Sequence, residues 1–333
     1  MMNPDTHHDA GRVHLGYSKP LYLLPFDHRA SYVAGMFHFK LPLSVPQREQ
    51  VIDSKQLIYE GFRQALTEGV PVEAAGILVD EEFGAAVLRD ARQRGCITAL
   101  CVERSGVDEF EFEYGRDFAS HIAAFDPTFA KVLVRYNPEG DRALNLRQVG
   151  RLKQLSEHCQ RSQQHFMFEL LVPPTDEQLA HAGGSKEAFD QRARPLLMQQ
   201  AVRELQDAGI EPDVWKVEGL DSPADGERIV DIARRSGRDQ VGCIVLGRGA
   251  DEAKVRHWLG VAAGVPGFVG FAVGRTSFWD AVAGHRAQTL TRAEARTQIA
   301  RRLREWVDVF EGGRLARAAG PDQTASSEPP ASG

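Results

Sequence analysis

Three strand-like segments carry charged side chains where apolar ones are expected. Lys131 opens KVLVRY, Glu169 lies within FMFELLV, and Lys216 lies within DVWKVE. Strands that are buried on both faces consist mainly of Val, Ile and Leu, so a charge inside one indicates a function or a buried ion pair. A lysine enclosed by apolar side chains and other cations loses its proton more easily, and the neutral amine attacks ketones. Lys216, between Trp215 and Val217, is therefore a candidate imine-forming lysine.

The alternative for Lys216 is a structural ion pair with Glu169 or Glu218. Side chains alternate along a strand, so Lys216 shares a face with Glu218, and Lys131 shares one with Arg135. In the catalytic interpretation, Glu169 moves protons, because a carboxyl group in an apolar strand has a raised pKa that suits this work. Lys131 then adds a second positive charge that lowers the pKa of Lys216 or orients a substrate hydroxyl.

Two glycine-arginine pairs follow the last two strand-like segments. Gly247-Arg248 lies in LGRGA and Gly274-Arg275 in AVGRTSFW, and each pair precedes a helix-like segment. Backbone N–H groups at a helix N-terminus together with an arginine bind phosphate. Barrel enzymes often bind phosphate in the loops after strands seven and eight. These pairs therefore predict a phosphate site.

Short apolar runs that alternate with amphipathic segments must position these residues. The apolar runs predict eight strands, at 21–26, 76–79, 97–102, 131–136, 166–172, 213–218, 242–247 and 268–273. The amphipathic segments predict helices over 47–68, 82–94, 113–124, 146–163, 187–208, 223–236, 251–263 and 277–310.

Eight strands, each followed by a helix, predict an α/β protein that forms a single-domain (β/α)₈ TIM barrel. A doubly wound sheet has the same element order, but no glycine-rich dinucleotide motif follows the first strand. We expect the barrel to span 18–312. The polar segment 1–17 and the Pro/Ser/Ala-biased segment 313–333 are expected to be disordered tails.

The composition excludes several classes of function. The formal net charge of −6 comes from interspersed acids and bases, which disfavours nucleic-acid partners. No apolar stretch approaches the length of a membrane span, and the N-terminus lacks the apolar core of a signal peptide. The four cysteines are widely spaced, which favours buried free thiols. We expect a cytoplasmic protein that binds a small molecule without a cofactor, and a homo-oligomer is compatible with the sequence.

The sequence resembles the class I aldolase superfamily, specifically its tagatose-1,6-bisphosphate aldolase branch. The first strand ends in Phe26-Asp27-His28-Arg29, as in F-D-x-R, and the sixth is Asp213 to Glu218, as in D-V-x-K-V-E. Within that branch, PFDHR, LVDEEFG, KVLVRYNPEG, FELLVPP and WKVEG are similar to the domain fused to 5-dehydro-2-deoxygluconokinase in myo-inositol catabolism. That domain is associated with cleavage of 2-deoxy-5-keto-D-gluconate 6-phosphate to dihydroxyacetone phosphate and malonate semialdehyde.

The resemblance implies a lyase with a site of known composition. Lys216 would form the Schiff base, Glu169 and Lys131 would assist proton transfer, Asp27 would contact a substrate hydroxyl, and Arg275 would bind phosphate. Two positions depart from the tagatose-type pattern, because His28 replaces an amide and Arg248 replaces a serine-like phosphate contact.

The acid end of such a substrate requires a cation. Arg104 or Arg135 could bind the carboxylate in a bidentate manner, and the sequence favours neither over the other. Other residues expected around the substrate are His28, Arg29, Gly247, Arg248, Gly274 and Glu218.

Other functions remain open at this point. An aldolase for tagatose bisphosphate or for a sulfo-sugar phosphate would use the same lysine. A metal-dependent aldolase is disfavoured, because the histidines do not have ligand spacing on neighbouring strand ends, so no metal site is expected. A non-catalytic sugar-phosphate-binding barrel could share the fold, since fold alone does not specify function.

Overall fold

Eight parallel strands form a closed barrel in the computed structural model, which describes residues 15–319. Each strand pairs with its neighbours in chain order, and β8 pairs with β1 to close the ring. The prediction of a single-domain (β/α)₈ TIM barrel is confirmed. The strands are β1 (Leu21–Pro25), β2 (Ala75–Val79), β3 (Ile97–Cys101), β4 (Phe129–Arg135), β5 (His165–Leu171), β6 (Val214–Glu218), β7 (Gly242–Leu246) and β8 (Phe268–Ala272).

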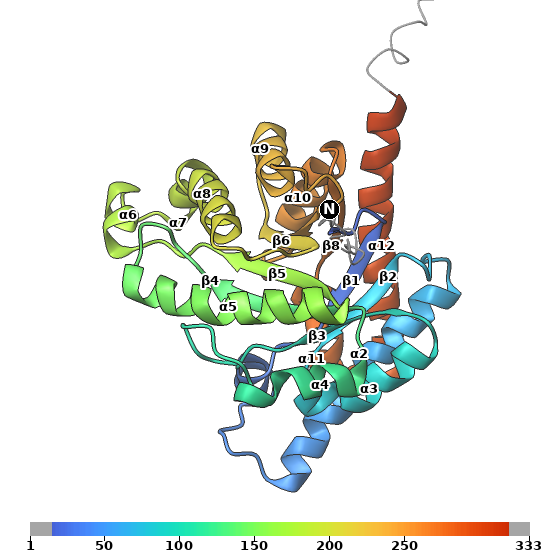
Figure 1. Ribbon diagram of the computed structural model, residues 1–333. Coiled ribbons are helices and arrows are strands. Elements are labelled where there is room, and N and C mark those ends of the chain that lie inside the picture. The colour runs from blue at the N-terminus through green and yellow to red at the C-terminus, as the bar shows by residue number, and fades with distance from the viewer. Residues whose placement is uncertain (1–14, 320–333) are drawn as a thin grey trace, which may run out of the picture.

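Helices surround the barrel, and the long α12 runs along its outside and projects beyond the strands (Figure 1). A short 3₁₀ helix, η2, and a π-helix, η1, add to them. The bounds are α1 (Ala30–Tyr32), η1 (Val33–Phe37), α2 (Val45–Thr67), α3 (Glu81–Gln93), η2 (Gly115–Asp117), α4 (Phe118–Phe125), α5 (Arg142–Ser162), α6 (Asp176–His181), α7 (Lys186–Arg192), α8 (Arg194–Asp207), α9 (Pro223–Arg234), α10 (Glu252–Gly264), α11 (Arg275–Arg286) and α12 (Arg292–Ala319).

The structure divides two segments that the sequence predicted as single helices. The segment 187–208 forms α7 and α8, because Pro195 cannot continue a helix but fits the first turn of a new one. The segment 277–310 forms α11 and α12, and Gln288 between them has a left-handed backbone. Helix α6 was not predicted. It begins at a capping box in which Thr175 and Gln178 satisfy each other's backbone N–H groups.

The expected domain boundaries differ from the helix and strand limits. Helix α12 continues through Ala319, seven residues past 312, because Arg314 and Arg317 bond to groups on the barrel side of the helix. Gly16 pairs with Gln240 and donates its N–H to Asp213, so part of the segment 1–17 joins the barrel. The remainder of both predicted tails, 1–14 and 320–333, lies outside the described residues.

The barrel interior has an apolar lower layer at the N-terminal ends of the strands. Its buried side chains come from alternate positions of the strands, and include Leu21, Leu23, Phe129, Met167, Val214 and Ile244. Tyr17 closes this end by packing edge-on against Phe129. The carboxylate of Asp213 accepts the N–H groups of Gly16 and Phe166, so this part of the D-V-x-K-V-E motif is structural.

Two further expectations can be compared with the described residues. All four cysteines are buried and unpaired, as the spacing predicted. Within residues 15–319, none of the helices combines the length and apolar character that crossing a bilayer requires.

Candidate active site

A cavity of about 470 Å³ opens at the C-terminal ends of the strands. This is the end at which barrel enzymes place their active sites, because the βα loops converge there. Eleven of the thirteen predicted site residues line this cavity, namely Asp27, His28, Arg29, Arg104, Arg135, Glu169, Lys216, Gly247, Arg248, Gly274 and Arg275. The other two, Lys131 and Glu218, lie behind its wall.

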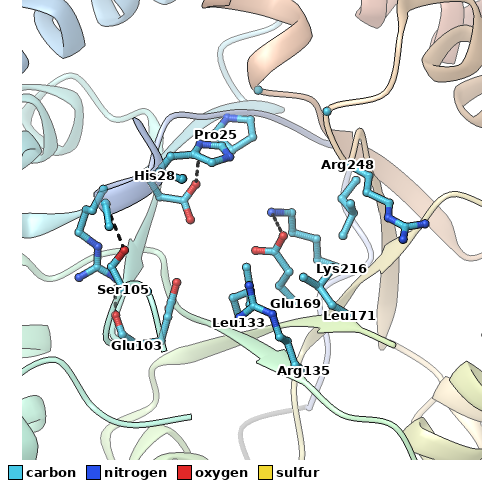
Figure 2. A pocket seen from close by; sticks show the side chains of 18 of the residues that line it. Pro25, His28, Glu103, Ser105, Leu133, Arg135, Glu169, Leu171, Lys216 and Arg248 are labelled. Atoms are coloured by element: carbon cyan, nitrogen blue, oxygen red, sulfur yellow. Dashed lines mark hydrogen bonds and ion pairs between the residues drawn. The ribbon is translucent and has the colours of Figure 1, made fainter. Parts of the chain in front are cut away.

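Lys216 and Glu169 meet on the floor of the cavity. They are direct neighbours in the register of β5 and β6, and both point inward (Figure 2). The Nζ atom of Lys216 lies 2.8 Å from Oε1 of Glu169, and both side chains are largely buried. This distance allows the carboxylate to take a proton from the amine and return it.

Lys131 lies beneath Glu169 and is completely buried. Its ammonium group contacts three carboxylates, those of Asp27 at 2.8 Å, Glu103 at 2.9 Å and Glu169 at 2.8 Å. Glu169 therefore joins the two lysines, because its two oxygens contact different ammonium groups. The cluster fixes the positions of the acids from β1, β3 and β5 around one cation.

The charges in this cluster set the protonation of its carboxylates. Burial alone would raise the pKa of Asp27, but the Lys131 ammonium lowers it well below its usual range. The pKa of Glu169 is likewise lowered, because Lys131 and Lys216 outweigh the effect of burial, so the raised pKa predicted from the apolar strand is wrong. Glu103 differs, since burial raises its pKa despite the contact with Lys131. Asp27 and Glu169 are therefore ionised at neutral pH.

Potential metal ligands lie near Lys131, although the sequence predicted no metal site. Within the described residues, Asp27, Cys101 and Glu103 place three potential ligand atoms within 4.8 Å of one another. The ammonium of Lys131 already bonds to both of these carboxylates, so a cation occupies the position that a metal ion would take. We do not assign these residues as metal ligands.

The predicted phosphate site lies where the β7 and β8 loops meet. Gly249 has a φ of +69°, and a Cβ there would lie 3.7 Å from Cδ of Arg275, which shows how closely the two loops approach. Gly274 precedes α11 and packs on β1, where a Cβ would come within 2.3 Å of the Pro25 carbonyl oxygen. The Nε of Arg275 is buried and has no hydrogen-bond partner among residues 15–319, and its Nη2 donates to Ser31. Arg275 and the α11 N-terminus are available to an anion.

Arg248 lines the cavity, but its guanidinium pairs with Glu218, which lies behind the cavity wall. The Arg248 guanidinium turns away from the cavity (Figure 2) and lies 3.0 Å from Glu218 and 2.7 Å from Asp190. Glu218 is only 2% exposed and also pairs with Arg194. Burial raises the pKa of Glu218 to about 7. Both side chains are engaged in ion pairs, and their contacts with a substrate stay a prediction.

The structure distinguishes the two arginines proposed for a carboxylate. Arg104 is more than half exposed and pairs with Glu111 at 3.0 Å. Arg135 points into the cavity from β4 (Figure 2), and the carboxylate nearest to it, Asp108, is 3.9 Å away and almost fully exposed. The Nη1 of Arg135 donates to the Val107 carbonyl at 3.3 Å, and the other donors of the guanidinium remain available at the cavity. Arg29 bonds to the Glu103 carbonyl and to the Glu113 carboxylate, so it holds the loop after β3 in place.

The comparisons with known proteins agree with the barrel architecture. Residues 7–314 match the family described as "Uncharacterized protein conserved in bacteria (DUF2090)". The chain belongs to the DUF2090 family. No curated protein sequence matches this DUF2090 chain significantly.

Two solved structures resemble the DUF2090 barrel at low sequence identity. One is Cgl0159 from Corynebacterium glutamicum, with a TM-score of 0.53 and 17% identity over 88% of each chain. The other is fructose-bisphosphate aldolase from Plasmodium falciparum, solved with TRAP and a small-molecule inhibitor, with a TM-score of 0.55 and 14% identity. That match covers 90% of this chain and 92% of the aldolase. At this level of identity, the likeness concerns the fold.

Glu103 is a buried acid of the DUF2090 site that the sequence did not predict. A charge at the end of a strand is most often a surface ion pair, and Glu103 on its own fits that description. Its position becomes informative only with the register, since β3 and β4 place Cys101 beside Lys131 and carry Glu103 to the same ammonium. The available signal was that Glu103 lies two residues beyond the strand residue Cys101, on the same face.

Proposed function

We propose that the protein is a class I aldolase that forms a Schiff base through Lys216. The observation that carries this proposal is an inward-pointing lysine on the cavity floor with a carboxylate 2.8 Å from its Nζ. An ion pair alone does not require an open cavity above the lysine. An amine beside a proton acceptor in such a cavity is suited to attack a ketone.

The reaction uses the cluster in a defined order. Glu169 removes a proton from Lys216, and the neutral amine adds to the substrate ketone. The same carboxyl group then protonates the departing hydroxyl as water leaves and the imine forms. Lys131 stays protonated throughout, because its three carboxylate contacts raise its pKa well above the usual value in spite of burial. The imine accepts the electron pair of the neighbouring carbon–carbon bond when that bond breaks.

The proposed substrate is a phosphorylated keto sugar acid, with 2-deoxy-5-keto-D-gluconate 6-phosphate as the specific candidate. Its cleavage gives dihydroxyacetone phosphate and malonate semialdehyde. Arg275 and the α11 N-terminus offer a phosphate site, and Arg135 offers a guanidinium for a carboxylate. A tagatose bisphosphate or a sulfo-sugar phosphate is the alternative substrate for the same lysine, and relative cleavage rates distinguish these choices.

Borohydride trapping tests the proposal directly. The protein is incubated with dihydroxyacetone phosphate and sodium borohydride, and its intact mass is measured. We expect one covalent adduct, which peptide mapping assigns to Lys216 and which Lys216→Met abolishes. Lys254→Met is the matched control, because Lys254 lies on α10 and pairs with Asp221 at the surface. Absence of an adduct with this ketone and with the keto acid phosphate would refute the aldolase and favour a sugar-phosphate-binding barrel.

A further inference from the structure

His28 has a side chain in the cavity wall that the steps above do not use. It follows β1, and its ring is about 30% exposed and lines the cavity (Figure 2). Its Nδ1 is buried and has no hydrogen-bond partner in the part of the chain that the structure describes. The nearest acid is Asp27, whose Oδ1 lies 4.0 Å from Nδ1. An unsatisfied buried atom beside a cavity is typical of a site that awaits a ligand.

The pairing with Asp27 orients the imidazole. A carboxylate on the Nδ1 side favours the tautomer with its proton on Nδ1, as in other histidines that an acid holds in place. The 4.0 Å separation is longer than a hydrogen bond, but such contacts shorten when substrate binds. Because Nδ1 is turned inward, the exposed edge of the ring, which carries Nε2, faces the cavity with a free lone pair.

The charged groups around His28 leave it neutral. Those facing it are Asp27 on its own segment, Glu169 on β5, Lys216 on β6 and Arg275 on α11. Burial has the largest effect and lowers the pKa of His28 to about 4, and Arg275 acts in the same direction. The imidazole is therefore unprotonated throughout the neutral range, with a nitrogen lone pair available.

The carboxylates of the site are less suited to this task. Asp27 and Glu169 are each already bonded to a lysine ammonium, and Glu169 is assigned to the proton transfers at Lys216. Glu103 has a raised pKa, but its free oxygen, Oε2, is buried. Among the described residues that line the cavity, His28 combines a neutral, unpaired nitrogen with an exposed edge.

We propose that His28 is the residue that takes the proton from the substrate hydroxyl when the carbon–carbon bond breaks. The proton moves from the hydroxyl to Nε2, and the O–H electron pair becomes the second bond of the aldehyde carbonyl. The electron pair of the broken bond moves into the imine and yields the neutral enamine on Lys216. In the condensation direction, His28 returns the proton to the new hydroxyl. This inference rests on the proposed aldolase function.

The test distinguishes proton transfer at the substrate hydroxyl from the formation of the imine and the enamine. His28→Gln keeps a polar side chain of similar reach but cannot carry a proton, and His181→Gln, on the exposed face of α6, is the matched control. Three quantities are measured: borohydride trapping with dihydroxyacetone phosphate, solvent exchange of its α-hydrogen, and condensation with malonate semialdehyde or glyceraldehyde 3-phosphate. Trapping and exchange need the imine and enamine, whereas condensation also needs a proton at oxygen.

We expect His28→Gln to keep trapping and exchange within threefold of the wild type while condensation falls by roughly 10²–10⁴-fold, the range for loss of an acid–base group. Equal condensation rates in the variant and the wild type would overturn the inference. Loss of exchange with trapping retained would also overturn it, since His28 would then act at carbon. A wild-type protein that neither traps nor exchanges would refute the proposed aldolase itself, which is a separate result.

Discussion

Three neighbouring strands carry inward-facing residues of opposite character only two positions apart. The pairs on β4, β5 and β6 are Phe129 and Lys131, Met167 and Glu169, and Val214 and Lys216. The first member of each pair belongs to the apolar lower layer, which Tyr17 closes. The second member belongs to the charged cluster beneath the cavity. On each of these strands, two residues therefore separate the hydrophobic core from the polar site.

The two layers contribute differently to the free energy of folding. Apolar side chains in the lower layer stabilise the fold by roughly 1.5–3 kcal/mol each when fully buried. Buried ions lose hydration that their mutual attraction only partly restores, so apolar replacements of similar shape are often as stable. The charged upper layer is therefore better explained by function than by stability. Substitutions in the upper layer should therefore reduce activity most, and substitutions in the lower layer should mainly reduce the free energy of unfolding.

Lys216→Met should give the largest effect on activity. We expect turnover to fall by at least ~10³-fold, as for other removed nucleophiles, because no other described side chain on the cavity floor presents an amine. The melting temperature should fall much less than in Lys131→Met, since methionine fills the space of the lysine chain and Glu169 keeps its contact with Lys131. Turnover assays and thermal unfolding measure the two quantities. A melting point that falls sharply together with activity would assign Lys216 to the structural role.

Lys131→Met should affect both activity and stability. Three buried carboxylates lose their shared cation, which should destabilise the fold by roughly 3–5 kcal/mol. Without the ammonium, burial would raise the pKa of Asp27 and Glu169, so both would take up protons at a higher pH than in the wild type.

The pKa values of Asp27 and Glu169 determine how stability and turnover change with pH. Both carboxylates have lowered pKa values in the folded wild type, so their contribution to stability is present at neutral pH and is lost only below the usual carboxylate range. In Lys131→Met, the acid limb of turnover and of stability should move to higher pH. Denaturant unfolding and turnover between pH 4 and 8 measure this displacement. Unchanged acid limbs would show that Lys131 does not control these carboxylates.

Phe129→Ala provides the corresponding test of the lower layer. The ring is fully buried on the strand that carries Lys131 and packs against Tyr17, so its loss should lower the free energy of unfolding by roughly 3–5 kcal/mol. Below the melting temperature, borohydride trapping should continue at Lys216. If this variant does not fold, Met167→Ala is a milder change in the same layer. Loss of trapping in a folded variant would contradict the separation of the layers.

The sequence predicted the barrel and the charged residues on the cavity floor because both depend on local patterns. Strand runs and helix periodicity are local, and charges within apolar strands such as those with Lys131 and Lys216 stand out individually. The division of the predicted helix 187–208 near Pro195 changed the helix limits and left the order of strands and helices as predicted. Glu103 was missed because its role depends on the register between β3 and β4. The orientation of Arg248 was not predictable for a related reason, since the side chain of a loop residue can turn either way, and here it pairs with Glu218 and Asp190.

Arg275 and Arg248 lie at the same end of the barrel and can be compared with each other. Their substitution should have the smallest effect on activity. Each follows a glycine at a strand end, but only Arg275 has an unpaired buried nitrogen near the cavity. Arg275→Ala should raise KM for a phosphorylated substrate by roughly 10–100-fold, the equivalent of one charge-assisted hydrogen bond or slightly more, and leave trapping of unphosphorylated dihydroxyacetone unchanged. Arg248→Ala should change KM less, because its guanidinium is held by two acids away from the substrate. A larger effect at Arg248 would mean that its side chain swings inward when phosphate binds.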